Sequence, residues 1–189
     1  RVVIIEDTRE LQCRAENLVA MRTKDNVATL SDLVRSSLRL RPVTDGDADA
    51  LFALHSDARV LRFWDSPPWT ERARADRFIA ACRQIEEEGS GARVAMERAS
   101  DGTFVGWCGL TMWNPAYRSA SLGYCLEEAA WGRGYATEAA RAVLGWAFEA
   151  LDLNRVQAET DTRNVASARV LEKLGFVHEV LQRDMTEVR

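Results

Sequence analysis

Two glycines stand directly before an amphipathic helix in residues 131–137. Glycine has no Cβ and tolerates a positive φ, so Gly132 and Gly134 indicate an open turn that a ligand can approach closely. From Ala136 onward apolar residues recur every three or four positions, which predicts a helix that starts at this turn. The first N–H groups of such a helix lack partners inside it and lie at the positive end of its dipole. The stretch is therefore predicted to bind the phosphates of a phosphorylated cofactor.

The turn does not match two widespread nucleotide-binding patterns. Gly-x-x-x-x-Gly-Lys-Ser/Thr is absent, and Gly-x-Gly-x-x-Gly fails because Thr137 stands at the position of its last glycine. The stretch resembles instead the acetyl-CoA pyrophosphate loop of the GCN5-related N-acetyltransferases (GNAT), Gln/Arg-x-x-Gly-x-Gly/Ala. Trp131 replaces the usual Gln or Arg, a departure similar to the RimJ/RimL branch, which acetylates the N termini of ribosomal proteins. The resemblance implies that acetyl-CoA is the cosubstrate and is bound by Trp131, Gly132, Arg133, Gly134, Tyr135, Ala136 and Thr137.

A second polar pattern follows about thirty residues later. Asn164 and Ser167 are spaced as Asn-x-x-Ser, and Lys173, Gly175 and Phe176 come after them. The pattern resembles the second cofactor motif of the same family, which implies that Asn164, Ser167 and Lys173 contact acetyl-CoA. An Asn amide can match the amides of the pantetheine arm, and a Ser hydroxyl can donate a proton. The alternative is structural, with Asn164 or Asp161 capping a helix and Ser167 idle in its first turn.

The resemblance also implies how the acetyl group moves. Two parallel strands, which end at Leu126 and near Thr160, splay apart so that the pantetheine arm pairs with an exposed strand edge. The N–H of Leu126 is then the donor to the thioester oxygen, which gains negative charge during attack. Ser167 is the expected acid for the leaving thiolate. Glu97 and Glu127 are the candidate bases.

Direct transfer to an amine is expected, because no Cys-His pair stands in a recognisable nucleophile motif and Cys125 is expected to pack. A peptide α-amino group, with a reference pKa of ~7.7–8.0, needs only a modest base, whereas a lysine at ~10.4 needs more help. A protein N-terminal amine is thus one acceptor. The alternatives are a small-molecule amine such as an aminoglycoside or polyamine, and a non-catalytic acetyl-CoA-binding regulator or a remnant secretion-ATPase module.

The composition bounds the class of protein. A chain of 189 residues with 47% hydrophobic residues suffices for one packed domain with an extension. The net charge of −4 and the pI near 5.4 argue against nucleic-acid binding, which depends on clustered Lys and Arg. No apolar run approaches the ~18 residues of a membrane span, and the first residues lack a signal-peptide pattern. We therefore expect a soluble, cytoplasmic protein with no membrane partner, a monomer or a homodimer.

The soft metal ligands are scattered along the chain. No Cys-x-x-Cys pair is present, so we expect reduced thiols and no metal site. His55 is expected to pack or cap rather than to catalyse. The residues concerned are Cys13, Cys82, Cys108, Cys125, His55 and His178.

The order of predicted elements agrees with the GNAT resemblance. Alternating apolar residues predict strands near residues 38–42, 91–97, 103–113, 120–126, 155–160 and 176–181. Helical spacing predicts helices around 51–55, 75–85, 136–151 and 164–174. The implied fold class is α/β (α+β), a GNAT fold over residues 38–183. Its mixed, mostly antiparallel twisted sheet has splayed parallel central strands and is flanked by helices.

Residues 1–37 differ from the rest. A β-branched run ends in Glu6 and Asp7, as in a strand that delivers carboxylates to a site, and residues 30–38 have helical spacing. Residues 3–42 resemble an internal piece of the conjugal-transfer and type IV secretion ATPases, in which Glu6 and Asp7 would lie in an acidic box beside the nucleotide. The phosphate loop of that family is missing, so we expect no ATPase activity. We predict an N-terminal extension over 1–37, a fusion fragment, before an acetyltransferase domain over 38–189. The alternative is a private extension with a chance match.

Overall fold

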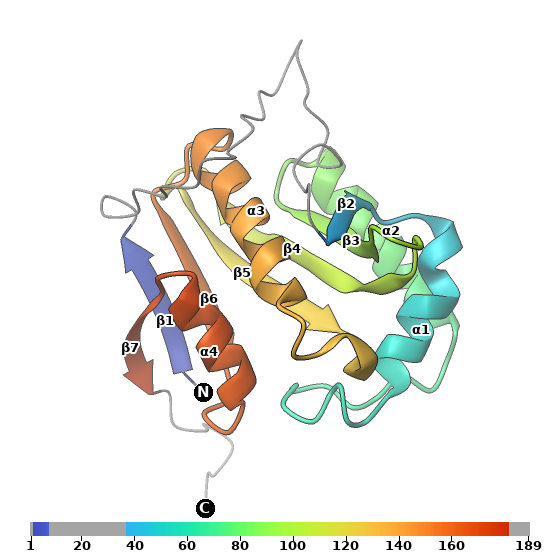
Figure 1. Ribbon diagram of the computed structural model, residues 1–189. Helices are drawn as coiled ribbons and strands as arrows, with labels where there is room; N and C mark the ends of the chain where they lie inside the picture. Colours follow the sequence, from blue (N-terminus) through green and yellow to red (C-terminus); the bar gives the residue numbers. More distant parts are fainter. Residues whose placement is uncertain (1, 8–36, 182–189) are drawn as a thin grey trace, which may run out of the picture.

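The computed structural model describes residues 2–7 and 37–181, which form one sheet with helices on both faces (Figure 1). The strands are β1 (Val2–Asp7), β2 (Leu38–Pro42), β3 (Ala92–Arg98), β4 (Phe104–Asn114), β5 (Ser119–Leu126), β6 (Arg155–Thr160) and β7 (Val177–Leu181). The helices are α1 (Ala48–Ser56), α2 (Ala73–Glu87), α3 (Tyr135–Glu149) and α4 (Val165–Lys173), with short 3-10 turns η3 (Asp45–Asp47) and η4 (Glu128–Ala130). Within these described ranges, none of the helices is long and apolar enough to span a membrane.

The elements expected from residue 38 onward are present in the expected order. Each predicted strand and helix lies within a few residues of its observed bounds. The second helix, α2, begins at Ala73, and the side chain of Arg72 before it forms no capping hydrogen bond. The helical spacing predicted for residues 30–38 lies almost entirely outside the described residues.

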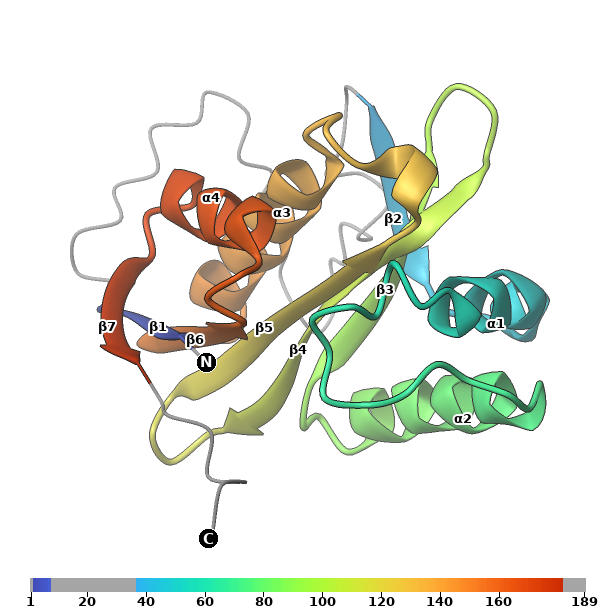
Figure 2. The same ribbon diagram turned by 90° about the horizontal axis from the view of Figure 1, so that it is seen from below.

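The sheet has the strand order β2-β3-β4-β5-β6-β1-β7. Every neighbouring pair is antiparallel except β5 and β6, which run parallel. Figure 2 shows α3 and α4 on one face of the sheet and α1 and α2 on the other. Side chains that alternate along β5 divide between two cores: Leu122 and Leu126 pack with α3 and α4, and Cys125 packs with α1 and α2.

The two parallel strands separate soon after they meet. β5 and β6 pair only over Ser119–Ser121 and 155–157, so residues 122–126 and 158–160 are not paired with each other. Gln157 donates a side-chain hydrogen bond of 3.1 Å to Ser121 Oγ where the pairing ends. The predicted splaying of these strands is thus confirmed. It leaves backbone groups along the inner edges of β5 and β6 open to an extended ligand.

The first strand occupies an internal position of the sheet. β1 pairs antiparallel with β6 along its whole length, with Val2 opposite Thr160 and Asp7 opposite Arg155, and its other edge pairs with β7. This placement differs from the predicted extension, because six of its residues belong to the same sheet as the predicted domain. The remainder of that segment, residues 8–36, lies outside the described residues.

Candidate functional site

The glycine turn has the open geometry that the sequence indicates. Gly132 and Gly134 have φ values of 72° and 84°, and a Cβ added to either would meet nothing within 4 Å. Gly134 is the N-cap of α3, and its carbonyl accepts the 3.0 Å hydrogen bond from the Glu138 N–H. The first backbone N–H groups of α3 therefore lie immediately after a turn with space for a bulky anionic group. The turn thus has the open space that the sequence predicts for the phosphates of a cofactor.

Trp131 joins this turn to the end of β5. Its indole N–H donates a 2.9 Å hydrogen bond to the Leu126 carbonyl, and the residue is 48% exposed. Arg133, the other large side chain of the turn, donates to the Ala129 carbonyl at 3.2 Å. The aromatic residue that replaces the usual Gln or Arg thus fixes the peptide group that follows Leu126.

The start of α4 faces the diverging part of β5. Asn164 caps the helix, because its Oδ1 accepts a 3.1 Å hydrogen bond from the Ser167 N–H. The Ser167 hydroxyl lies 2.8 Å from the phenol oxygen of Tyr124, and that phenol also donates to the Ser167 carbonyl at 3.4 Å. Asn164 therefore has the capping role that was the structural alternative, while Ser167 is engaged in a side-chain pair.

Tyr124 was not singled out from the sequence as a functional residue. Its alternation with Leu122 and Leu126 placed it on the face of β5 that turns toward α3 and α4. A polar tyrosine among those apolar neighbours was the available signal. Burial raises the pKa of Tyr124 to about 12, although the hydrogen bond with Ser167 lowers it. The phenol therefore keeps its proton at neutral pH.

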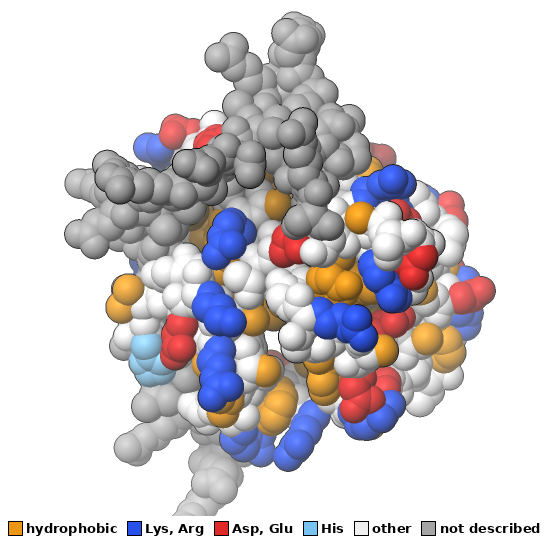
Figure 3. All heavy atoms as spheres, in the orientation of Figure 1, with side chains coloured by type: hydrophobic (Ala, Val, Ile, Leu, Met, Phe, Trp, Pro, Cys, Tyr) orange, Lys and Arg blue, Asp and Glu red, His pale blue; other side chains and the backbone are white. Residues whose placement is uncertain are grey.

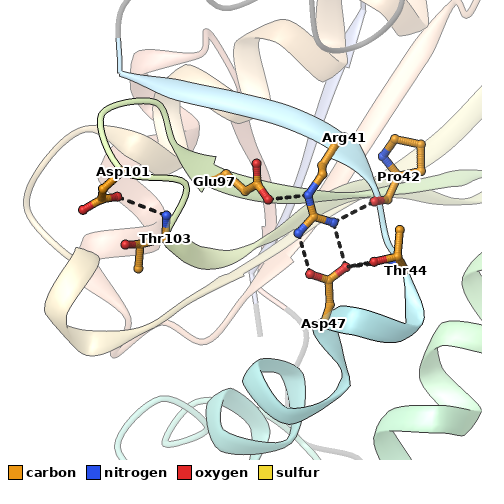
Figure 4. A network of polar contacts seen from close by, with 7 residues as sticks. All are labelled: Arg41, Pro42, Thr44, Asp47, Glu97, Asp101 and Thr103. Carbon is orange, nitrogen blue, oxygen red and sulfur yellow. Dashed lines mark hydrogen bonds and ion pairs between the residues drawn. The ribbon is translucent and has the colours of Figure 1, made fainter.

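Glu97, one candidate base, belongs to an ion-pair network that joins β2, β3 and the start of α1 (Figure 4). The Arg41 guanidinium donates to Glu97 and makes two hydrogen bonds with the carboxylate of Asp47. Asp47, which is 4% exposed, also accepts from the Thr44 N–H at 2.7 Å. Burial raises the pKa of Asp47, but the hydrogen bonds from Arg41 and Thr44 outweigh it and hold that pKa below its usual value. The carboxylate of Glu97 is thus bound by Arg41, which also binds Asp47.

Glu127, the other candidate base, stands directly after Leu126 at the end of β5. Its backbone N–H donates to the Val105 carbonyl at 3.0 Å, which fixes the main chain at this point. Burial raises the pKa of its half-buried carboxylate, although the charge of Arg98 acts in the opposite direction. A carboxylate with a raised pKa is a stronger base than an exposed one. Glu127 thus differs from Glu97, whose carboxylate is bound by Arg41.

The segment between α1 and α2 contacts residues that follow β5 and residues that follow β6, the two strands that separate. Arg59 pairs with Glu128 of η4 at 2.5 Å and with Asp57 at 2.8 Å. Arg163, in the turn before α4, lies 6.0 Å from the ring centre of Phe63. Residues 57–68 therefore lie beside the loops that follow β5 and β6, at the end of the sheet where these strands have separated (Figure 1).

His55 and the described cysteines have structural positions. His55 is 4% exposed, stacks on Trp69 at 4.2 Å and accepts a 3.0 Å hydrogen bond from the Trp107 indole. Burial lowers the pKa of His55 to about 4, so the ring is neutral at pH 7. Its predicted packing role is confirmed. Burial raises the pKa of Cys125 to about 12, which keeps it a protonated thiol and a poor nucleophile. Cys82, Cys108 and Cys125 are buried free thiols, while Cys13 lies outside the described residues.

Two further expectations concern positive charge and metals. Lys173 lies in the last turn of α4, about 12 Å along the axis from its first residue, so α4 separates it from Asn164 and Ser167. Figure 3 shows a row of Lys and Arg side chains over α3 and α4. Exposed residues of that kind on these helices are Arg141, Arg169 and Lys173.

In the part of the chain that the structure describes, no group of three or more His, Cys, Asp or Glu residues could hold a metal ion.

Comparison with known proteins agrees with this geometry. Residues 37–177 match the model of the acetyltransferase (GNAT) domain. The probable N-acetyltransferase YjcK of Bacillus subtilis is 40% identical over 160 residues, which cover 80% of this chain and 87% of that protein. A putative ribosomal-protein-serine acetyltransferase from Vibrio cholerae has 27% identity and a TM-score of 0.66, and the match covers 75% of this chain and 80% of that one. A spermidine N-acetyltransferase from Vibrio cholerae in complex with CoA and spermine has 22% identity, a TM-score of 0.67 and coverages of 76% and 82%, a likeness of fold.

A second kind of relative matches part of the chain. The conjugal transfer protein TrbB of Rhizobium radiobacter is 34% identical over 96 residues, which cover 46% of this chain and 27% of that protein. The similarity is in keeping with the conjugal-transfer resemblance but does not by itself extend to an ATPase activity.

Proposed function

We propose that the acceptor of this protein is the α-amino group of a protein N terminus. The premise is that the chain belongs to the GNAT acetyltransferase family and is an acetyl-CoA-dependent N-acetyltransferase. The observation that carries the proposal is the pairing of Asp57, Glu128 and Asp161, the carboxylates around residues 57–68, with Arg59 and Arg163. The roles of individual residues below are part of the proposal.

Acetyl-CoA supplies an acetyl group on a thioester, which is activated toward attack by an amine. Gly132, Gly134 and the N–H groups at the start of α3 would hold its diphosphate, because the turn has space and unpaired donors there. The edge of β5 beyond Ser121 would pair with the amides of the pantetheine arm. The row of cationic side chains over α3 and α4 favours the phosphates on this face (Figure 3).

The N–H of Leu126 is the proposed donor to the thioester oxygen. A fixed donor stabilises charge that develops during attack without having to reorganise. The Trp131 indole holds the carbonyl of Leu126, and the Glu127 N–H is bound to Val105, so both polar atoms of the peptide group between Leu126 and Glu127 are fixed. This rigidity supports a positioning role for Trp131.

Glu127 is the proposed base, acting directly or through water. An α-amino group with a reference pKa of ~7.7–8.0 is partly neutral at physiological pH, so a half-buried carboxylate is sufficient to take its proton. The raised pKa of Glu127 supports this assignment. Glu97 is less suited, because Arg41 already binds it.

The charges around residues 57–68 favour a singly charged acceptor over a polyamine. Arg59 pairs with Asp57 and Glu128, and Arg163 pairs with Asp161. A polyamine needs several available carboxylates, whereas these three are paired with two arginines, which leaves one net negative charge among the five side chains. The 27% identity to a putative ribosomal-protein acetyltransferase also supports a protein acceptor. A polyamine remains the second candidate, since a spermidine acetyltransferase shares the fold.

The test measures release of free CoA thiol from acetyl-CoA with matched acceptors. A short peptide with a free N terminus is compared with the same peptide N-acetylated, both containing one lysine, and with spermidine and an aminoglycoside. We expect release with the free peptide and none above background with its blocked copy. Faster turnover with spermidine or the aminoglycoside would assign the acceptor to a small amine. Equal turnover of the two peptides would assign it to the lysine side chain.

For the beginning of the chain we propose a separate origin from a conjugal-transfer protein. The partial match to TrbB and the resemblance of residues 3–42 support this origin. No nucleotide hydrolysis is expected, since a P-loop sequence is absent. Measurable ATP hydrolysis by the purified protein would contradict this.

A further inference from the structure

We propose that Tyr124 delivers the proton to the departing thiolate and that Ser167 positions it. The inference rests on the proposed acetyl transfer and replaces Ser167, the acid expected from the sequence, with its hydrogen-bond partner. It requires Tyr124 to lie beside the proposed path of the pantetheine arm, to keep a transferable proton, and to be a better acid than Ser167.

The position of Tyr124 meets the first requirement. Tyr124 lies in the part of β5 beyond Ser121, where pairing with β6 has ended. It shares a face of the strand with Leu126, whose N–H is the proposed donor to the thioester oxygen. Its phenol reaches the first turn of α4, where its oxygen is 2.8 Å from Ser167 Oγ. The phenol thus links β5 to α4 across the diverging strands.

The second requirement is a proton that remains at neutral pH. The surroundings of Tyr124 are largely apolar, since it packs against the core that contains Leu122, Leu126 and Leu171. Burial disfavours a phenolate and keeps the pKa of Tyr124 high, so the group is a donor throughout the physiological range. Neither histidine is placed to act as the acid instead of Tyr124. His55 is buried against Trp69 and Trp107, and His178 lies on β7.

The third requirement separates the two hydroxyls. A thiol has a reference pKa of ~8.5, and the pKa of Tyr124 is about 12, so proton transfer from this phenol to a thiolate is uphill, but less so than transfer from an aliphatic hydroxyl. An aliphatic hydroxyl is close to water in acidity, far weaker than a phenol, and gives up its proton far less readily. The 2.8 Å contact allows Ser167 to be the donor to the phenol oxygen. In that arrangement the phenol keeps its own proton, which makes only the long 3.4 Å contact with the Ser167 carbonyl, while the Ser167 hydroxyl stabilises the phenolate that forms and lowers the pKa of Tyr124.

The proton and bond balance is complete with solvent as the only other reactant. The amine nitrogen bonds to the acetyl carbon, and the bond from that carbon to sulfur breaks with its electron pair on sulfur. The sulfur takes the phenol proton of Tyr124. The nitrogen loses one proton to Glu127 or to water, and the phenolate regains one from solvent. The products are the amide and the CoA thiol.

The experiment compares Tyr124→Phe with Ser167→Ala and their double variant, with Tyr117→Phe as the matched control because Tyr117 is 77% exposed. Thiol release gives kcat and KM, and calorimetry gives the acetyl-CoA affinity. Loss of a general acid should lower kcat of Tyr124→Phe by ~10²-fold or more, with acetyl-CoA affinity within about twofold. Ser167→Ala should lower kcat less, and the double variant should match Tyr124→Phe, because Ser167 acts through the phenol.

A larger loss of kcat for Ser167→Ala than for Tyr124→Phe would overturn the proposal in favour of Ser167 itself. So would a Tyr124→Phe variant with unchanged kcat. If Tyr124→Phe does not fold, 3-fluorotyrosine placed at position 124 retains the hydroxyl and lowers its pKa. The alkaline fall of kcat should then move to lower pH, and an unmoved profile would overturn the proposal. A wild-type protein that binds acetyl-CoA but acetylates no amine would instead refute the proposed function on which this inference rests.

Discussion

Among single residues, the protein combines one local feature, the open turn at Gly132 and Gly134, with two contacts between distant residues, Glu97 with Arg41 and Tyr124 with Ser167. The glycine turn at 132 and 134 could be predicted because the absence of a Cβ is a property of each residue alone. The pairing of Glu97 with Arg41 joins residues 56 positions apart, and the pairing of Tyr124 with Ser167 joins residues 43 apart. Such contacts depend on how strands and helices pack, so the sequence alone does not show that Arg41 binds Glu97 or that Tyr124 contacts Ser167.

The glycine turn leads to a test with a matched control. A Val at position 134 would occupy the open space beside the start of α3 and would be strained at φ 84°, so the diphosphate would lose N–H contacts. Hydrogen bonds to a charged group are worth about 1.5–3 kcal/mol, so we expect acetyl-CoA affinity to fall ~10- to 100-fold. Calorimetric titration measures this affinity.

The control for Gly134→Val is Gly102→Val. Gly102 has a φ of 71° and also has nothing within 4 Å of an added Cβ, but it lies in the turn between β3 and β4. The two variants therefore carry similar backbone strain at different sites. Equal losses of affinity in both would show that strain rather than obstruction of the turn is responsible.

At the scale of elements, local periodicity predicted most of the fold. β5 alternates apolar and small residues, and α3 repeats its apolar residues every three or four positions, so their types and bounds were close to those observed. The position of β1 was not predictable in this way. Its β-branched run indicated a strand, but strand order is set by pairing with distant residues, and β1 lies between β6 and β7.

The internal position of β1 changes the expectation for a truncated chain. Deleting residues 1–7 would expose the edges of both β6 and β7, which β1 now pairs. At about 0.5–1.5 kcal/mol for each backbone hydrogen bond, the loss should reach about 3 kcal/mol or more. This corresponds to a fall in Tm of ~6–12 °C. Thermal unfolding followed by circular dichroism measures it.

A deletion of residues 16–27, which retains β1 and leaves residues 8–15 and 28–36 to connect it to β2, is the companion variant to the deletion of residues 1–7. The connection must stay this long because β1 and β2 are five strand spacings apart in the sheet, about 24 Å. If β1 completes the sheet, the first deletion destabilises the protein more than the second. An unchanged Tm and unchanged acetyl-CoA binding after removal of residues 1–7 would show that β1 is dispensable and that the extension predicted from the sequence is separable from the domain.

At the scale of the whole molecule, the site is assembled from both faces of the sheet. The glycine turn, β5 and α4 supply the proposed acetyl-CoA contacts on the side of α3. The segment 57–68 comes from the helices of the opposite face and meets the first side through Arg59 and Phe63. This arrangement suggests that donor and acceptor contacts can be changed separately.

Arg59→Ala tests that separation. The substitution removes the ion pair of Arg59 with Glu128 and frees residues 57–68 from η4, while the glycine turn is left unaltered. Exposed ion pairs contribute about 0.2–1 kcal/mol, so we expect the KM for the acceptor peptide to rise up to about fivefold, with the KM for acetyl-CoA nearly constant.

The control is Arg77→Ala. Arg77 of α2 is also exposed, and it pairs with Glu71 at 3.9 Å, away from η4. Initial rates measured while each substrate is varied in turn separate the two constants. If Arg59→Ala raised the KM for acetyl-CoA instead, residues 57–68 would act on the cofactor side, and the division of the site between the two faces would be wrong.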